Sequence, residues 1–167
     1  MKAALLVIDL QKQFSGGPNT PFFDSASRTI NRALNLFRSN NLPVIWIQQT
    51  VESRGLVPGT EGFDFIEGLD FRDDEYSVHK HWSNSFNGTG LDEILKKEGA
   101  DTVVVSGFRA QNCINETYCG ALESGYTAAV LKDGIASDSL HAIRMVESCC
   151  DCISLRLLEM MVNHKAH

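Results

Sequence analysis

The sequence predicts an α/β fold in which helices cover both faces of a mostly parallel β-sheet. Short, continuous apolar segments alternate with segments of helical periodicity along the whole chain. Continuous apolar strands are typical of parallel sheets, because such strands are buried on both faces, and each parallel connection needs a crossover. With 167 residues and no linker or internal repeat, the chain is expected to form a single domain over residues 1–167.

The first two strands and the first helix are predicted from the N-terminal third of the chain. Ala3–Leu10 is a continuous apolar run that is too short for an exposed helix, which predicts a buried strand. Asp24 or Ser25 is a suitable N-cap for a helix that runs to about Ser39 with apolar side chains on one face. The β-branched and aromatic segment Pro43–Gln49 predicts the second strand.

The middle of the chain combines a long irregular segment with a short strand and a helix. Thr50–Asp74 is rich in glycine and has no sustained period. A loop of this length inside a compact domain usually has a function. Ser77–Lys80 predicts a short strand, which we place in the centre of the sheet, and Gly90–Glu98 predicts a helix that Gly99 ends.

The second half continues the alternation of strands and helices. Its apolar runs and helical patterns predict, in order, the strand Thr102–Gly107, the helix Asn112–Ser124, the strand Tyr126–Asp133, a helix from Ser137 or Asp138 to Cys149, the strand Cys152–Leu155 and a last helical segment Arg156–Val162. The whole chain therefore contains six predicted strands.

Composition excludes several classes of protein. The 15 basic and 21 acidic residues give a net charge of −6, which argues against nucleic-acid binding. The longest apolar run, Ala3–Ile8, is too short to span a membrane or to serve as a secretory signal. Five Cys residues without the spacing of a disulfide framework indicate a reducing, cytoplasmic location and at least one free thiol.

Three side chains with complementary chemistry are predicted at the carboxyl ends of strands, where ligands bind in open parallel sheets. Asp9 and Lys80 end two strands, and Cys113 lies where the strand Thr102–Gly107 turns into a helix. The N–H groups of a helix N-terminus lower the pKa of a thiol and can stabilise an oxyanion. With Asp9 as the base and Lys80 as the cation, this set predicts acyl transfer by a nucleophilic cysteine.

Four sequence blocks carry a resemblance to a known family. They are Asp9-Leu-Gln11-Lys-Gln-Phe14, then Lys80-His-Trp82-Ser83-Asn-Ser85-Phe86 with Gly88-Thr89-Gly-Leu91, then Ser106-Gly107-Phe-Arg-Ala-Gln-Asn-Cys113 with Glu116-Thr117, and finally Gly125-Tyr126 through Asp133. In order and over nearly the whole chain, these blocks resemble the isochorismatase-like cysteine hydrolases, the superfamily of nicotinamidase and N-carbamoylsarcosine amidohydrolase.

The resemblance implies a three-layer fold with a six-stranded, mostly parallel sheet and a catalytic triad of Asp9, Lys80 and Cys113. In that family the cysteine attacks an amide-like carbonyl, the amine leaves, and water cleaves the thioester. The resemblance also implies a cis peptide bond between Phe108 and Arg109. The oxyanion hole would consist of the backbone N–H groups of Arg109 and Cys113. Relatives form dimers or larger assemblies, so we expect a homo-oligomer.

The chain departs from two branches of the family. Nicotinamidases carry metal-binding histidines after the second strand, whereas residues 48–53 contain none here, so we expect no metal and no cofactor. True isochorismatases lack the nucleophilic cysteine. If Lys80 faces the site, strand alternation turns His79 and His81 away from it, which argues against a metal site there.

The substrate is expected to be a small molecule held by residues near the triad. Phe14 and Trp82 are predicted walls of the pocket, because pockets are mainly apolar with few polar groups. Phe108 and Gln111, close to Cys113 in sequence, are the other predicted substrate-binding residues. Arg109 either binds a substrate carboxylate or is simply exposed.

Two alternatives remain open for function. A non-catalytic member of the fold would use the same pocket to bind a small ligand or to assemble. The remaining cysteines allow a redox hypothesis for Cys149, Cys150 and Cys152, whereas a zinc site there needs His141 or His164 as further ligands. We favour packing on a helix face for this cluster, and we place Cys119 in the core.

Overall fold

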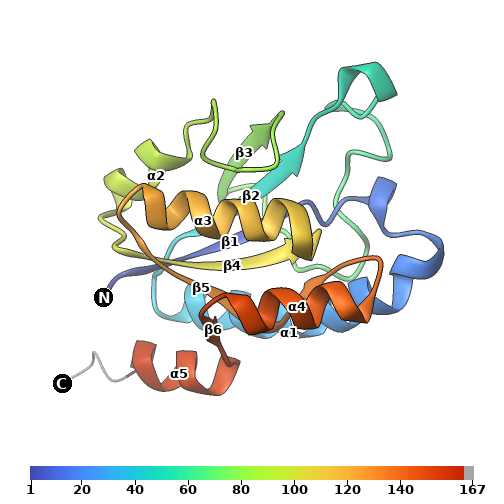
Figure 1. Cartoon of the computed structure of the whole chain (residues 1–167). Coiled ribbons are helices and arrows are strands. Elements are labelled where there is room, and N and C mark those ends of the chain that lie inside the picture. Colours follow the sequence, from blue (N-terminus) through green and yellow to red (C-terminus); the bar gives the residue numbers. More distant parts are fainter. Residues whose placement is uncertain (164–167) are drawn as a thin grey trace.

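The central element is a six-stranded sheet in which all strands are parallel. The computed structural model describes residues 1–163 and orders the strands β3-β2-β1-β4-β5-β6 (Figure 1). The strands are β1 (Ala3–Ile8), β2 (Val44–Gln49), β3 (Tyr76–Lys80), β4 (Thr102–Phe108), β5 (Thr127–Ala136) and β6 (Cys152–Ile153). All six predicted strands are present, which confirms the predicted fold class.

Helices form a layer on each face of the sheet. The helices are α1 (Thr20–Ser39), α2 (Leu91–Glu98), α3 (Asn115–Glu123), α4 (Leu140–Cys149) and α5 (Leu155–Asn163). Side chains alternate along a strand, so Leu5 and Val7 of β1 pack with α1 and α5, whereas Leu6 and Ile8 pack with α2, α3 and α4. This alternation creates two apolar cores and explains why β1 is apolar at every position.

The order of the strands places the site between β1 and β4. The chain builds the sheet outward from β1 to β3 on one side and from β4 to β6 on the other. Ligands bind at such a reversal because the two crossovers leave a crevice at the carboxyl ends of the strands. Gly107 allows β4 to approach β1 closely there, since a Cβ atom at this position would lie 2.0 Å from the carbonyl oxygen of Ile8.

Several helices begin at residues other than those predicted. Helix α3 begins at Asn115 and not at Asn112, because the π-helical turn Ala110–Ile114 comes first. The helix α1 starts at Thr20, before Asp24 and Ser25, because Pro21 fits its first turn and has no N–H to satisfy. Helix α4 is capped by Ser139, whose Oγ accepts a hydrogen bond from the Ala142 N–H at 3.2 Å. The strand β5 stays paired with β4 up to Ala136, which moves the start of α4 towards the C-terminus.

The position of β3 corrects the prediction of a central strand. Among the strands of residues 1–163, it pairs only with β2 and forms one edge of the sheet.

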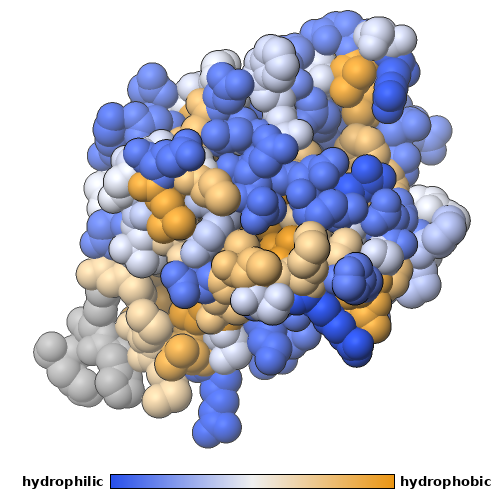
Figure 2. Space-filling model, viewed as in Figure 1, coloured by the Kyte–Doolittle hydropathy of each residue, from blue (hydrophilic) through white to orange (hydrophobic). Residues whose placement is uncertain are grey.

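None of the helices within the described residues is long and apolar enough to cross a membrane. Several exposed apolar side chains lie together over α4 and α5 (Figure 2). They are Leu140, Met145, Leu157, Met160 and Met161.

Candidate active site

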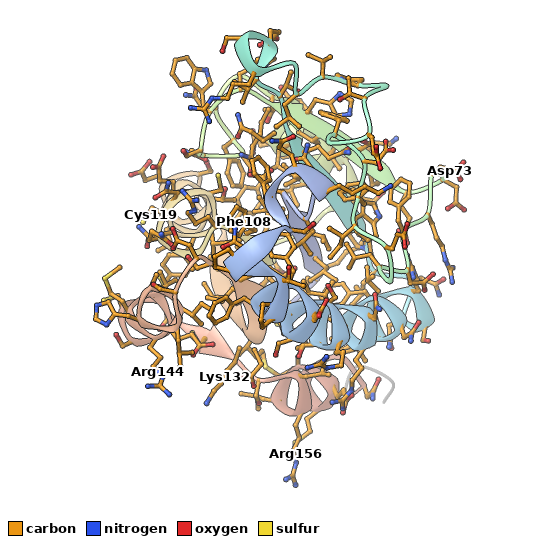
Figure 3. All side chains as sticks on the ribbon, turned by 90° about the vertical axis from the view of Figure 1, so that its right-hand side faces the viewer. Asp73, Phe108, Cys119, Lys132, Arg144 and Arg156 are labelled. Carbon is orange, nitrogen blue, oxygen red and sulfur yellow. The ribbon has the colours of Figure 1, made fainter. Side chains whose placement is uncertain are left out.

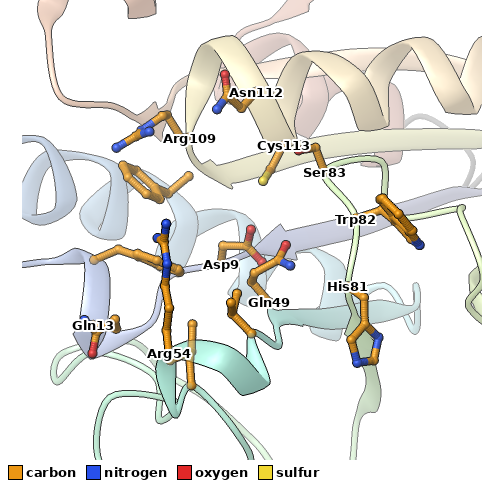
Figure 4. A pocket seen from close by; sticks show the side chains of 14 residues that line it. Asp9, Gln13, Gln49, Arg54, His81, Trp82, Ser83, Arg109, Asn112 and Cys113 are labelled. Atoms are coloured by element: carbon orange, nitrogen blue, oxygen red, sulfur yellow. The ribbon is translucent and has the colours of Figure 1, made fainter.

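The structure brings Asp9, Lys80 and Cys113 together at the carboxyl edge of the sheet (Figure 4). The Lys80 ammonium donates to Asp9 Oδ2 at 2.9 Å and lies 3.4 Å from the Cys113 sulfur. Lys80 and Asp9 are almost completely buried, with exposed fractions of 0% and 1%. Both charges therefore depend on each other for stabilisation, because a buried charge without a partner is very costly.

Each of the three side chains is positioned by the end of a strand. Asp9 directly follows β1 and has a positive φ of 53°, which turns the chain out of the sheet. Lys80 is the last residue of β3. Cys113 lies in the π-helical turn Ala110–Ile114, which connects β4 to α3. Three segments that are distant in sequence thus meet because parallel strands end at the same edge of the sheet. Lys80 contacts Asp9 from the edge strand β3, with β2 between their two strands.

Gln49 is a site residue that the sequence analysis missed. Its side-chain oxygen accepts a hydrogen bond from Lys80 at 2.5 Å, and the Trp82 carbonyl accepts another at 3.1 Å. The buried Gln11 amide holds the Gln49 backbone through hydrogen bonds of 2.8 and 3.1 Å. The place of Gln11 in the Asp-x-Gln block was the available signal for this arrangement, whereas Gln49 itself belongs to no block.

The Cys113 thiol is protonated in the resting protein. Burial and the negative charge of Asp9 raise the pKa of the Cys113 thiol to about 11, despite the opposing effect of Lys80. The predicted lowering of this pKa is therefore wrong, because desolvation and the neighbouring carboxylate outweigh the helical N–H groups. Burial also raises the pKa of Asp9, although Lys80 opposes this effect.

The carboxylate of Asp9 has one oxygen available for chemistry. Oδ2 accepts from Lys80, whereas Oδ1 is buried and has no hydrogen-bond partner within the described residues. Figure 4 shows the Cys113 sulfur pointing towards Asp9. A buried oxygen without a partner is unfavourable at rest, and it is suited to accept a proton from the thiol when the thiol attacks.

A cavity of about 440 Å³ opens over the triad. Its apolar wall includes Phe14 and Phe108, whose rings stack with their centroids 5.5 Å apart, and Trp82 lies on another side. Figure 3, which looks onto the carboxyl edge of the sheet, shows Phe108 near the middle of this edge. The structure thus places three of the four predicted substrate-binding residues at one cavity, next to Cys113.

Gln111 is the predicted substrate-binding residue that does not line the cavity. Its amide oxygen accepts from Ser137 Oγ at 2.5 Å, and its amide nitrogen donates to Asp138 at 3.1 Å. The reason is the π-helical turn, which carries Asn112 and Cys113 to the cavity and directs Gln111 towards the loop between β5 and α4.

His81 lines the cavity, contrary to the prediction that it faces away. The strand β3 ends at Lys80, so the alternation of side chains no longer applies at the next residue. His81 Nε2 lies 2.7 Å from a carboxylate oxygen of Glu52. His79 does face away from the site, and its ring packs edge-on against Phe63 with the centroids 5.0 Å apart.

The irregular segment after β2 contributes to the cavity, as its length suggested. A short 3-10 turn, Glu52–Arg54, and a bridge between Val51 and Leu56 fold its first part over the site. Val51, Arg54 and Leu56 line the cavity. The glycine-rich composition of this segment predicted a loop but not which of its side chains turn inward.

Arg109 lies at the same cavity, next to the cis peptide bond that joins it to Phe108. Its guanidinium lies over the Phe108 ring, 5.2 Å from the centroid, and 3.7 Å from an Asp138 oxygen. The cis bond agrees with the sequence resemblance. It occurs where the chain leaves β4 for the turn that carries Cys113.

Within residues 1–163, no group of three or more His, Cys, Asp or Glu side chains is arranged to hold a metal ion. His164 lies outside the described residues.

All five cysteines are free thiols. Cys119 is exposed on the outer side of α3 (Figure 3), so its predicted place in the core is wrong, whereas Cys150 and Cys152 pack against the core.

Comparisons with known proteins agree with this architecture. Residues 3–154 match the isochorismatase domain. An uncharacterized isochorismatase family protein of Bacillus subtilis, YddQ, is 32% identical over 146 residues, which cover 84% of this chain and 81% of the relative.

Two solved structures share the fold over nearly their full length. An isochorismatase-like hydrolase from Alkaliphilus metalliredigens has a TM-score of 0.87 and 28% identity, with 96% of this chain and 99% of that chain covered. N-carbamoylsarcosine amidase from Thermoplasma acidophilum has a TM-score of 0.78 and 27% identity, with 92% and 95% covered. With the domain match and the Bacillus relative, they show that the chain belongs to the isochorismatase family.

Proposed function

We propose that this protein is a metal-independent cysteine hydrolase that cleaves a small amide or a related C–N bond through a thioester on Cys113. The observation that supports this proposal is the completely buried Lys80, which contacts both a carboxylate and a thiol. Burying two charges beside a cysteine is costly, and a protein that only binds a ligand has no chemical need for it.

In the first step, Asp9 removes the proton from Cys113 while the sulfur attacks the substrate carbonyl. An S–C bond forms, and the electron pair of the C=O double bond moves to oxygen. The predicted oxyanion donors are the backbone N–H groups of Arg109 and Cys113. Coupling proton transfer to attack is needed here because the pKa of Cys113, at about 11, leaves little thiolate at neutral pH.

In the second step, the tetrahedral intermediate breaks down. The C–N bond breaks, and the nitrogen takes its electron pair and the proton held by Asp9, so the amine leaves neutral. Water then attacks the thioester while Asp9 accepts its proton. When the C–S bond breaks, that proton returns to sulfur, which regenerates the thiol and releases the carboxylic acid.

Lys80 supports these steps electrostatically. Its positive charge favours the ionised form of Asp9 and offsets the charge that develops on sulfur during attack. The hydrogen bonds to Gln49 and to the Trp82 carbonyl hold the ammonium between the two groups. The lysine thus acts as a fixed charge.

The test is to replace Cys113 and to measure the turnover of a panel of small amides by the variants. We expect Cys113→Ala and Cys113→Ser to lower ammonia or amine release by at least about 10³-fold, because the nucleophile and its base act as a unit. Cys119→Ala is the matched control, since Cys119 is exposed and lies outside the cavity. Full turnover by Cys113→Ala would refute the proposed mechanism.

The second candidate is a ligand-binding or assembly protein that uses the same cavity. The raised pKa of Cys113 is compatible with it, since a protonated thiol is unreactive at rest. Mass spectrometry of the intact protein after incubation with activated amides separates the two, because only the hydrolase accumulates an acyl adduct on Cys113. The homo-oligomer, the cytoplasmic location and the redox hypothesis for the other cysteines stay predictions.

A further inference from the structure

The charges that line the cavity do not balance. Asp9 is neutralised by Lys80, and His81 on the far side is paired with Glu52. Arg54 and Arg109 also line the cavity. The cavity is therefore locally positive, although the chain has a net charge of −6. A positive cleft in an acidic protein concentrates anions at that place.

The two arginines approach the cavity from different segments. Arg54 ends the 3-10 turn after β2, and Arg109 follows β4. Figure 4 shows both guanidinium groups on one side of the cavity, with Trp82 and His81 on the opposite side and Cys113 between them. A ligand that places its carbonyl at Cys113 can therefore extend towards both guanidinium groups at once.

Neither arginine is fully paired. Arg54 has no acidic partner within residues 1–163. Arg109 has a carboxylate oxygen of Asp138 at 3.7 Å, but its Nε is buried and has no hydrogen-bond partner among the described residues. A guanidinium presents a planar set of N–H donors that matches a carboxylate, so these two side chains leave donors available to a ligand.

We propose that the substrate carries a carboxylate in addition to the scissile amide, and that Arg54 and Arg109 bind it. This inference rests on the proposed function, because the position of the amide is taken from Cys113. The stacked rings of Phe14 and Phe108 provide an apolar wall of the same cavity, which suits a short hydrocarbon spacer. The substrate class is thus the monoamide of a small dicarboxylic acid or a close analogue.

The experiment measures protection of Cys113 from iodoacetamide by matched compounds. Succinamate and glutaramate carry a carboxylate, whereas succinamide and glutaramide are nearly isosteric and neutral. Peptide mass spectrometry reports alkylation of Cys113, and the exposed Cys119 serves as the internal reference. We expect the better monoamide to halve alkylation at a concentration about tenfold lower than its diamide, because charge-assisted hydrogen bonds to guanidinium groups add affinity.

Variants assign this preference to the two arginines. We expect Arg54→Gln and Arg109→Gln each to remove most of the tenfold preference. Arg28→Gln, on the exposed face of α1, should retain it. Equal protection by both members of each pair, protection by neither, or a preference that survives both substitutions would overturn the carboxylate site. None of these outcomes would contradict the cysteine mechanism, which is tested separately by the loss of amide turnover in Cys113→Ala.

Discussion

The buried ion pair between Asp9 and Lys80 leads to a quantitative prediction about stability. At 2.9 Å and an effective dielectric constant of about 20, the two charges attract each other by about 6 kcal/mol. Desolvation offsets most of this attraction, but removal of one partner leaves the other charge buried. We therefore expect Lys80→Met to lower the free energy of unfolding by about 3–5 kcal/mol.

A double-mutant cycle separates this effect from general damage. Asp9→Asn should also destabilise the protein, since it leaves Lys80 without an anionic partner. The double variant Asp9→Asn/Lys80→Met contains neither charge and should be more stable than Lys80→Met alone, with a coupling energy of at least about 2 kcal/mol. Urea unfolding, monitored by the fluorescence of the buried Trp46 and by circular dichroism, measures the three variants and the wild type.

The pH dependence provides a second measurement on the same variants. The pKa of Asp9 is raised above its ordinary value of 3.8, so the folded state binds this proton more tightly than the unfolded state. The stability that this tighter proton binding contributes is therefore lost as the pH rises from about 4 through the pKa of Asp9 in the folded state. Lys80→Met removes the charge that opposes this shift, so its stability deficit should be smaller at pH 5 than at pH 8.

The exposed pair Asp92–Lys96 is the matched control. These side chains lie 2.5 Å apart on α2, where Lys96 is exposed and Asp92 is partly exposed, and their coupling should lie within experimental error. Additive effects of Asp9→Asn and Lys80→Met, within about 0.5 kcal/mol, would refute the conclusion that the two charges depend on each other.

Three further predictions concern other parts of the site. Gly107→Ala should lower the free energy of unfolding by more than about 4 kcal/mol, since its Cβ would meet the Ile8 carbonyl; a urea midpoint near that of the wild type would contradict this. Gln11→Ala should lower the free energy of unfolding by about 2–4 kcal/mol in the same assay, because it removes two hydrogen bonds to the partly buried end of β2 at the Gln49 backbone. Alkylation of Cys113 by iodoacetamide should still increase above pH 9, because the thiol pKa is about 11; a plateau below pH 9 would indicate a lowered pKa.

Sequence patterns predicted the elements well because each depends on local periodicity. The continuous apolar run of β1 indicated burial on both faces, and the structure shows two cores, one on each face. Gly99 was predicted to end α2, and it adopts the left-handed conformation with φ of 65°. Start points were less accurate. The local signal of Pro21 for the start of α1 was overlooked, whereas the start of α4 depends on the long pairing of β5 with β4.

The site was only partly predictable, for the same reason. Asp9, Lys80 and Cys113 were chosen by their positions at strand ends, and the parallel sheet brings those ends together. The predicted directions of the His81 and Gln111 side chains relative to the cavity were wrong, because the end of β3 and the π-helical turn decide where these side chains point. Gln49 was overlooked because its role requires Lys80, which is distant in sequence.

The sequence by itself determined the fold class, the strand ends that carry the reactive groups and the family resemblance. These features follow from local periodicity and from residues in fixed order along the chain. Only the tertiary structure decided the protonation of the cysteine and the charge of the cavity. Burial and the distances between Asp9, Lys80 and Cys113 set the first, and the inward turn of Arg54 and Arg109 sets the second. Electrostatic energies depend on separation in space and on solvent access, which the order of residues does not specify.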